Sequence, residues 1–133
     1  MKLLFLVFFN VLAGPLQRGK VIFDIPRLKN KNMTQIKKIL GKPKYDDVPS
    51  NFQTQAGATG DAYFYKQGFT LEVTYNPVNK KVIDFFIGKD HSVKDYTELE
   101  IAGNVFNSTD FFLSPVRENN RPSLFTGVTV TPK

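Results

Sequence analysis

The sequence contains no cysteine and no tryptophan, and it has only one histidine among 133 residues. The absence of cysteine excludes a disulfide framework, a thiolate metal site, a cysteine nucleophile and a lipid-bearing cysteine. The single histidine, His91, stands beside Ser92. A Ser–His site needs residues that are separated in the chain and brought together with an orienting acid, so we interpret this pair as part of a helix start. We expect no catalytic residues and no enzyme activity.

Motifs for metals, phosphates and cofactors are also missing. The sequence has no Ca²⁺-loop or zinc spacing, and its glycines do not form a phosphate loop of the GxxxxGK type. Adjacent Asp46 and Asp47 could bind a hard cation, which prefers several oxygen ligands, but a solvated loop pair is the simpler interpretation. We expect no metal and no cofactor. A hydrolase that uses Asp61 and Asp84 is the least favoured alternative, because it would require both carboxylates to converge in a pocket.

Only one long hydrophobic run occurs, and it lies at the N-terminus. Residues 3–12 are apolar except for Asn10, Lys2 precedes them, and Val11 and Ala13 fit a cleavage site with small residues. The run is shorter than the roughly 20 apolar residues of a membrane-spanning helix. The pattern therefore favours an export signal.

We predict a signal peptide at residues 1–13 and a single domain at residues 14–133. The mature protein is then expected outside the cell or in the periplasm or cell envelope, with no integral membrane span. An uncleaved anchor, a truncated start and a buried core segment are the alternatives. If the run is not a signal, we expect the protein in the cytoplasm.

The whole chain has a formal net charge of +6, and the positive charge is concentrated in one part of it. Residues 18–44 contain nine basic residues and one acid, whereas residues 45–133 contain 8 basic and 11 acidic residues. A candidate basic patch consists of Lys29, Lys31, Lys37, Lys38, Lys42 and Lys44. Such a patch would bind an anionic partner, which could be nucleic acid, an anionic lipid, a cell-wall polymer or an acidic protein. A solvated helix face that aids solubility is the interpretation we favour.

Residues 32–43 carry the signals of a short helix. Asn32 and Gln35 have the spacing of a capping box, and Thr34 is an equally good cap for a slightly shorter helix. Gly41 can adopt a left-handed conformation, and Pro43 prevents continuation. One face of this helix is apolar, with Met33, Ile36, Ile39 and Leu40.

The hydrophobic pattern then changes to a period of two. Five segments are predicted as strands: residues 62–66, 69–75, 82–87, 111–116 and 126–131. Short connections favour an antiparallel meander for the first three, and a second helix is predicted to start at Ser92. Residues 45–60 are predicted as a loop. The fold class is therefore α+β, with short helices packed on an antiparallel sheet in the order helix, three strands, helix, two strands.

A family resemblance covers about residues 25–87. The helix and its stop resemble those of the SmpA/OmlA domain in Met33, Thr34, Ile36, Leu40, Gly41 and Pro43. The continuation is similar in Tyr63, Tyr65, Leu71, Val73, Tyr75 and residues 82–87. That domain belongs to a small outer-membrane lipoprotein of the barrel-assembly machinery, whose lipid-bearing cysteine this chain lacks. The arrangement is also similar to that of the β-lactamase inhibitor protein, in which a helical layer packs on an antiparallel sheet.

The resemblance implies a non-catalytic envelope or secreted module that binds another protein. Our leading prediction is therefore an exported binding module with a protein partner. The alternative is a polyanion-binding protein that uses the basic N-terminal third of the chain.

Overall fold

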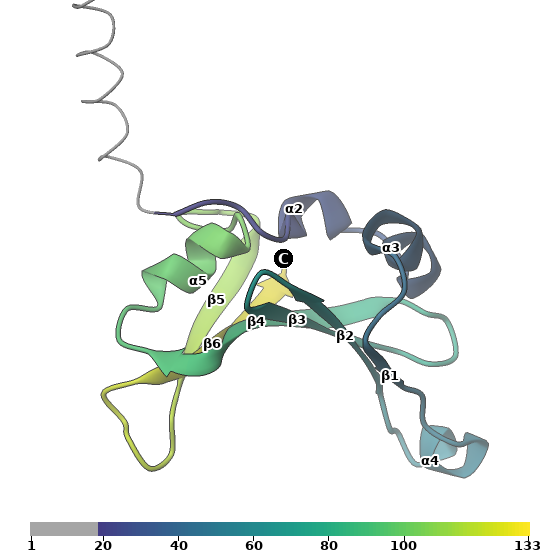
Figure 1. Ribbon diagram of the computed structural model, residues 1–133. Helices are drawn as coiled ribbons and strands as arrows, with labels where there is room; N and C mark the ends of the chain where they lie inside the picture. Colours follow the sequence, from purple (N-terminus) through teal and green to yellow (C-terminus); the bar gives the residue numbers. More distant parts are fainter. Residues whose placement is uncertain (1–18) are drawn as a thin grey trace, which may run out of the picture.

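The computed structural model describes residues 19–133, and the predicted signal peptide at residues 1–13 lies outside them. Three short helices lie on one face of an antiparallel sheet: α2 (Ile25–Leu28), α3 (Met33–Leu40) and α5 (Thr97–Ala102) (Figure 1). The predicted α+β class is confirmed. No helix within the described residues is long and apolar enough to cross a membrane.

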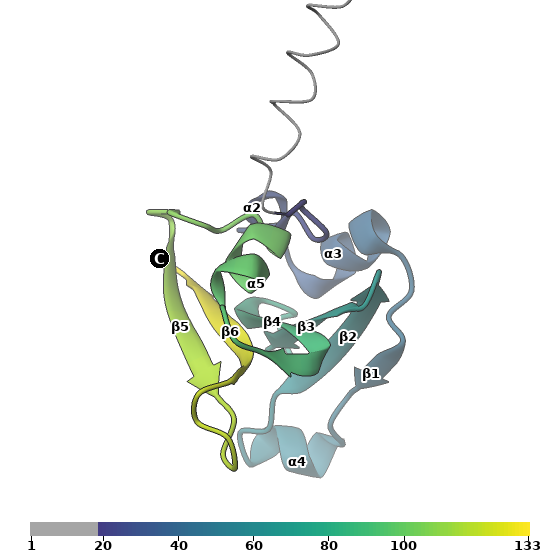
Figure 2. The same cartoon turned by 60° about the vertical axis from the view of Figure 1, so that its left-hand side comes forward.

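The sheet has six strands: β1 (Tyr45–Asp47), β2 (Gly60–Lys66), β3 (Phe69–Tyr75), β4 (Val82–Val93), β5 (Phe111–Arg117) and β6 (Phe125–Pro132). Their order across the sheet is β1-β2-β3-β4-β6-β5, and all neighbours are antiparallel. The first four form a meander. The connection through α5 then leads to the far edge, so that β6 returns between β4 and β5 (Figure 2).

The short helix predicted within residues 32–43 spans Met33–Leu40, and Asn32 rather than Thr34 caps its start. Asn32 and Gln35 form the capping box, with two hydrogen bonds of 2.9 Å. Gly41 follows with φ +88°, a conformation that a residue without a Cβ adopts at little cost. The backbone N–H of Met33 donates to the carbonyl of Lys80 at 2.9 Å and ties the helix start to the β3–β4 turn.

The predicted second helix start at Ser92 is wrong. Ser92 lies within β4, which continues to Val93, and the helix begins only at Thr97. Asp95 accepts a hydrogen bond from the backbone N–H of Thr97 at 3.0 Å. The strand extends further than the pattern suggests because residues beyond Gly88 still find a partner, as in the pairing of Val93 with Phe125.

The predicted order of elements is incomplete, because it lacks α2, β1 and α4 (Asn51–Gln55). Two of these elements fall within the segment predicted as a loop at residues 45–60. The strand β1 has three residues, and only pairing with β2 defines it as a strand. The helix α4 has no buried residue and starts at a capping box of Ser50 and Gln53.

The hydrophobic core lies between the helices and one face of the sheet. The helices contribute six fully buried side chains: Ile25, Leu28, Met33, Ile36, Leu99 and Ala102. The facing strands contribute Ala62, Phe64, Leu71, Val73, Tyr75, Phe85, Ile87, Val128 and Val130. Burial of each large apolar side chain stabilises the fold by roughly 1.5–3 kcal/mol. This packing fixes which face of every strand points inward.

The opposite face of the sheet carries no helix layer within residues 19–133 (Figure 1). The helix α4 and the β5–β6 turn project at two ends of the sheet, on the side away from α2, α3 and α5 (Figures 1 and 2). The sheet is bounded by β1 and β5. The strand β1 is only three residues long. The strand β5 contains Pro115, which is paired with Val128 and has no backbone N–H to donate.

Candidate functional site on the open sheet face

One side of the sheet is not covered by the helices that enclose the core (Figure 1). Side chains alternate along a strand, so the strand register places every second residue on this side. Five aromatic residues lie there: Tyr45, Tyr63, Tyr65, Phe86 and Phe112. Four carboxylates lie there: Asp47, Asp61, Glu72 and Asp84. We call this surface of nine residues the open face.

The aromatic side chains of the open face are substantially accessible. Tyr45 is 65% exposed, Tyr65 is 51% exposed and Phe112 is 62% exposed. Tyr45 pairs across strands with Tyr63, and their rings meet edge to face with centroids 6.5 Å apart. On neighbouring α4, Phe52 is 83% exposed. Tyr45 and Tyr65 lie at the β1–β2 edge of the sheet, and Phe112 lies at the β5 edge, so the exposed rings form separate groups on one face. Exposed apolar patches often mark interaction sites.

The carboxylates form a row across four strands. Asp47 pairs with Asp61, and Thr74 stands between Asp61 and Asp84. The Thr74 hydroxyl donates to Asp61 Oδ1 at 2.8 Å. Burial, together with the charge of Asp61, raises the pKa of Asp84, although the neighbouring Thr74 hydroxyl opposes the shift. The row therefore places negative charge at one end of strands β1 to β4, on the half of the open face that lies away from β5.

Glu72 ties the carboxylates to the aromatic residues. It lies between Tyr63 and Phe86 in the strand register. A side-chain hydrogen bond with Glu72, followed by burial, raises the pKa of Tyr63 to about 12. Within the described strands, no outward position beside these residues carries a lysine or arginine.

Two lysines at the border of the open face form cation–π contacts with its aromatic rings. Lys44 Nζ lies 5.0 Å from the ring centroid of Tyr65 and 5.9 Å from that of Tyr45. Lys133 Nζ lies 5.0 Å from the centroid of Phe112. Cations are attracted to the negative face of an aromatic ring, so the open face offers both apolar area and sites for positive groups.

No family model, no curated protein and no solved structure matches this chain. The resemblance to the SmpA/OmlA domain therefore stays a prediction.

The six lysines of the predicted basic patch are divided among three places on the helical side and the β1 edge. Lys29 and Lys31 line a hollow of about 430 Å³ together with Lys81. A more open hollow near the end of α3 is lined by Lys37, Lys42 and Lys44, together with Asp46. Lys38 lies exposed on α3 and lines neither hollow.

Lys37 forms an ion pair with Asp46, which leaves less of its charge available to a ligand. Asp46 points to the helical side, where it also accepts a hydrogen bond from the Tyr75 hydroxyl at 2.9 Å. Asp47, its neighbour in sequence, points to the open face. The adjacent carboxylates considered for a cation therefore lie on opposite sides of β1. Within residues 19–133, no group of three or more His, Asp or Glu side chains gathers as metal ligands.

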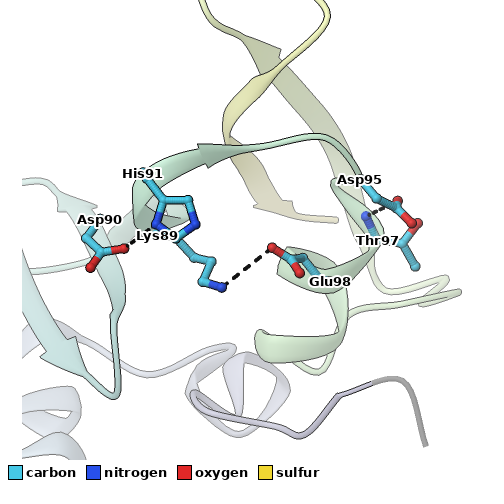
Figure 3. Close-up of polar contacts among 6 residues, drawn as sticks. All are labelled: Lys89, Asp90, His91, Asp95, Thr97 and Glu98. Carbon is cyan, nitrogen blue, oxygen red and sulfur yellow. Dashed lines mark hydrogen bonds and ion pairs between the residues drawn. The ribbon is translucent and has the colours of Figure 1, made fainter.

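The single histidine lies in an exposed stretch of β4, as Figure 3 shows. His91 Nδ1 is 2.7 Å from Asp90 Oδ1, and both side chains are more than half exposed. The nearby ion pair of Lys89 with Glu98, at 3.7 Å, links β4 to α5. Since Ser92 follows His91 on a strand, their side chains point to opposite sides.

Asp61 and Asp84 lie on strands that flank β3, about 10 Å apart by the usual strand spacing. Neither of them lines any of the hollows near α2 and α3. The convergence in a pocket that a hydrolase would require is therefore not seen at those hollows.

From the sequence we considered Asp61, Asp84, Tyr63 and Tyr65 separately and did not predict that they share one surface. Alternation could have grouped the residues of each strand, whereas the uncovered face is evident only from the helix packing.

Proposed function

We propose that this chain is an exported, non-enzymatic binding module that recognises a protein partner through the open face. The observation that carries the proposal is the set of exposed aromatic side chains on a sheet face without a helix layer. Tyr45, Tyr65 and Phe112 keep more than half of their surface accessible. Large exposed apolar patches are uncommon on monomeric proteins and often mark interaction sites.

The chemistry of the open face fits protein recognition. Aromatic side chains bury a large area with few rotatable bonds, and they are enriched among the residues that dominate binding energy. The sheet holds them in fixed register, so little conformational entropy is lost on binding. The four carboxylates would favour basic side chains in the partner, because complementary charge steers association.

Site-specific photo-crosslinking tests the proposal. A photo-reactive amino acid at Phe112 probes the open face, and the same amino acid at Val78, which is 76% exposed in the β3–β4 turn, is the matched control. In envelope extracts we expect a discrete protein adduct from the Phe112 probe only, with competition by unlabelled protein. Equal adduct patterns from both positions, or no adduct from the folded Phe112 variant, would contradict the proposal.

Export is proposed from the apolar N-terminal run and has its own test. Intact-mass analysis after cell fractionation should find a product that begins near Gly14 in the exported fraction. A full-length product confined to the cytosol would remove export from the proposal, while leaving recognition through the open face to be judged by the crosslinking experiment.

A second candidate function, polyanion binding, is favoured by the composition of one hollow. The hollow of about 430 Å³ is lined by three lysines and four amide side chains, and by no acid: Lys29, Lys31, Lys81, Asn30, Asn32, Gln35 and Asn79. Several cations without a nearby carboxylate attract an anionic polymer and release its counterions on binding.

Charge reversal distinguishes this candidate. Binding to double-stranded DNA and to vesicles that contain anionic lipid should weaken in the Lys29→Glu/Lys31→Glu variant and fall steeply with salt. The Lys37→Glu/Lys38→Glu variant tests the other half of the predicted patch. Binding that is absent, or insensitive to salt and to both variants, would exclude polyanion recognition by these lysines.

A further inference from the structure

A separate groove lies between α2, the end of α3 and the end of β2, on the helical side of the molecule. It has a volume of about 320 Å³, which falls in the range of small-molecule sites. Its apolar lining includes Phe23, Leu28 and Phe64, which are each at most 4% exposed, together with Ile39 and Leu40 of α3. Ile39 and Leu40 pack against the core but remain partly accessible.

Three cationic side chains surround this apolar lining. Arg27 comes from α2, Lys42 follows α3, and Lys66 ends β2. Within residues 19–133, none of the three takes part in an ion pair or a cation–π contact. By contrast, Lys37, Lys44 and Lys89 are all engaged in such contacts.

The one acid in the lining has a polar partner. Asp24 Oδ1 accepts a hydrogen bond from the Asn104 side chain at 2.9 Å. The three cations therefore outnumber the single carboxylate at an apolar groove. An anionic head group with an attached apolar chain complements both properties, whereas a neutral chain or a compact anion complements only one of them.

We propose that this groove binds a single-chain amphiphile with a carboxylate head group, such as a fatty acid. The chain lies along the apolar lining, and the head group lies among Arg27, Lys42 and Lys66. This site is distinct from the open face, and it does not depend on the function proposed there.

The test is a titration of the full-length protein with dodecanoate below its micelle-forming concentration, followed by calorimetry and backbone amide NMR. We expect saturable binding with amide shifts at Ile39, Leu40 and Phe64. The Lys42→Ala/Lys66→Ala variant should bind about tenfold more weakly, because it loses charge-assisted contacts to the head group. Replacement of the same two lysines by arginine should preserve binding.

Other ligands and variants separate the alternatives. Dodecyl phosphate distinguishes a lipid-like phosphate from a carboxylate, inorganic phosphate tests the head group alone, and dodecyltrimethylammonium tests the chain with opposite charge. Lys38→Ala, which removes an exposed charge outside the groove, should leave binding unchanged. Equal or tighter binding of the cationic amphiphile, equal binding of inorganic phosphate, unchanged affinity of Lys42→Ala/Lys66→Ala, or no saturable binding would each overturn the proposal. Tighter binding of dodecyl phosphate would overturn its choice of carboxylate.

Discussion

The ring of Phe86 on β4 lies directly over Gly127 on β6. A Cβ atom at Gly127 would be 2.2 Å from Phe86 Cζ and 2.5 Å from Phe86 Cε1. Gly127 is paired across the strands with Gly88, so the ring occupies space that two missing side chains leave on the open face. Aromatic rings that cover glycines in this way help to fix strand register.

Substitution Gly127→Ala should therefore destabilise the protein. The new methyl group would collide with Phe86 and would also lie 2.7 Å from the backbone oxygen of Ile87. Overpacking of this kind costs about 1–3 kcal/mol. A lower midpoint of urea unfolding is the expected result, with Gly19→Ala as the control, since its Cβ would make an ordinary contact of 3.5 Å with Ile101. Equal midpoints for the two variants would show that Phe86 does not occupy this space.

Loss of the Tyr75 hydroxyl should also weaken the fold. Tyr75 is 1% exposed, and its hydroxyl donates to Asp46 Oδ1 at 2.9 Å. Tyr75→Phe keeps the ring but removes this hydrogen bond, which should lower the free energy of unfolding by about 1 kcal/mol. Tyr65→Phe, at a half-exposed position, should have no measurable effect. Chemical denaturation of both variants decides the matter, and a stability of Tyr75→Phe equal to wild type would contradict the prediction.

Two tyrosines should make stability fall at alkaline pH. Burial and the hydrogen bond to Asp46 raise the pKa of Tyr75 to about 12, and Tyr63 has a pKa of about 12 as well. The unfolded chain releases these protons near pH 10, so their contribution is complete below about pH 10 and is lost as pH rises towards about 12. Denaturation midpoints and tyrosinate absorbance, measured across this range, test the effect. A Tyr63→Phe/Tyr75→Phe variant with an unchanged alkaline slope would refute it.

Asp84→Asn should make the protein slightly more stable than wild type near neutral pH. Burial and the charge of Asp61 raise the pKa of Asp84, so the folded state favours its protonated form. Protonated Asp84 therefore stabilises the folded state at pH values below the pKa that this carboxyl has in the unfolded chain. This stabilisation is lost as the pH rises through the pKa of Asp84 in the folded protein. The gain should be below about 1 kcal/mol, because the side chain is partly solvated. Thermal unfolding should show a difference from wild type at about pH 7 that disappears at about pH 3, while Asp90→Asn serves as an exposed control.

Much of the sheet could be predicted because its local signals agree with its packing. The alternation from Phe69 to Tyr75 places Leu71 and Val73 in the core, and the observed strand has the predicted bounds. Gln67 and Gly68 both have positive φ in the turn before it, as expected of a tight hairpin connection. For α3, the capping residues and the Gly41 stop act within a few residues of each other, so the sequence pattern was sufficient.

The errors have a different physical origin, since they concern elements that distant partners define. The strand β1 exists because β2 is beside it, and β4 continues to Val93 because Phe125 is available opposite. The helix α5 starts at Thr97, whose backbone N–H donates a hydrogen bond to the side chain of Asp95. Similarly, the six lysines were predicted to form one patch because they are close in sequence. In the structure the chain direction places them at different sites, and one of them forms an ion pair.

The two edges of the sheet give the open face a further property. An extended peptide can pair with a long unprotected edge almost regardless of its sequence, because such pairing uses only backbone groups. Here one edge is three residues long and the other is interrupted by Pro115. Neither edge therefore presents a long row of free backbone groups to an extended segment. The exposed aromatic residues of the open face are thus not accompanied by a strand edge of the kind that seeds fibrils.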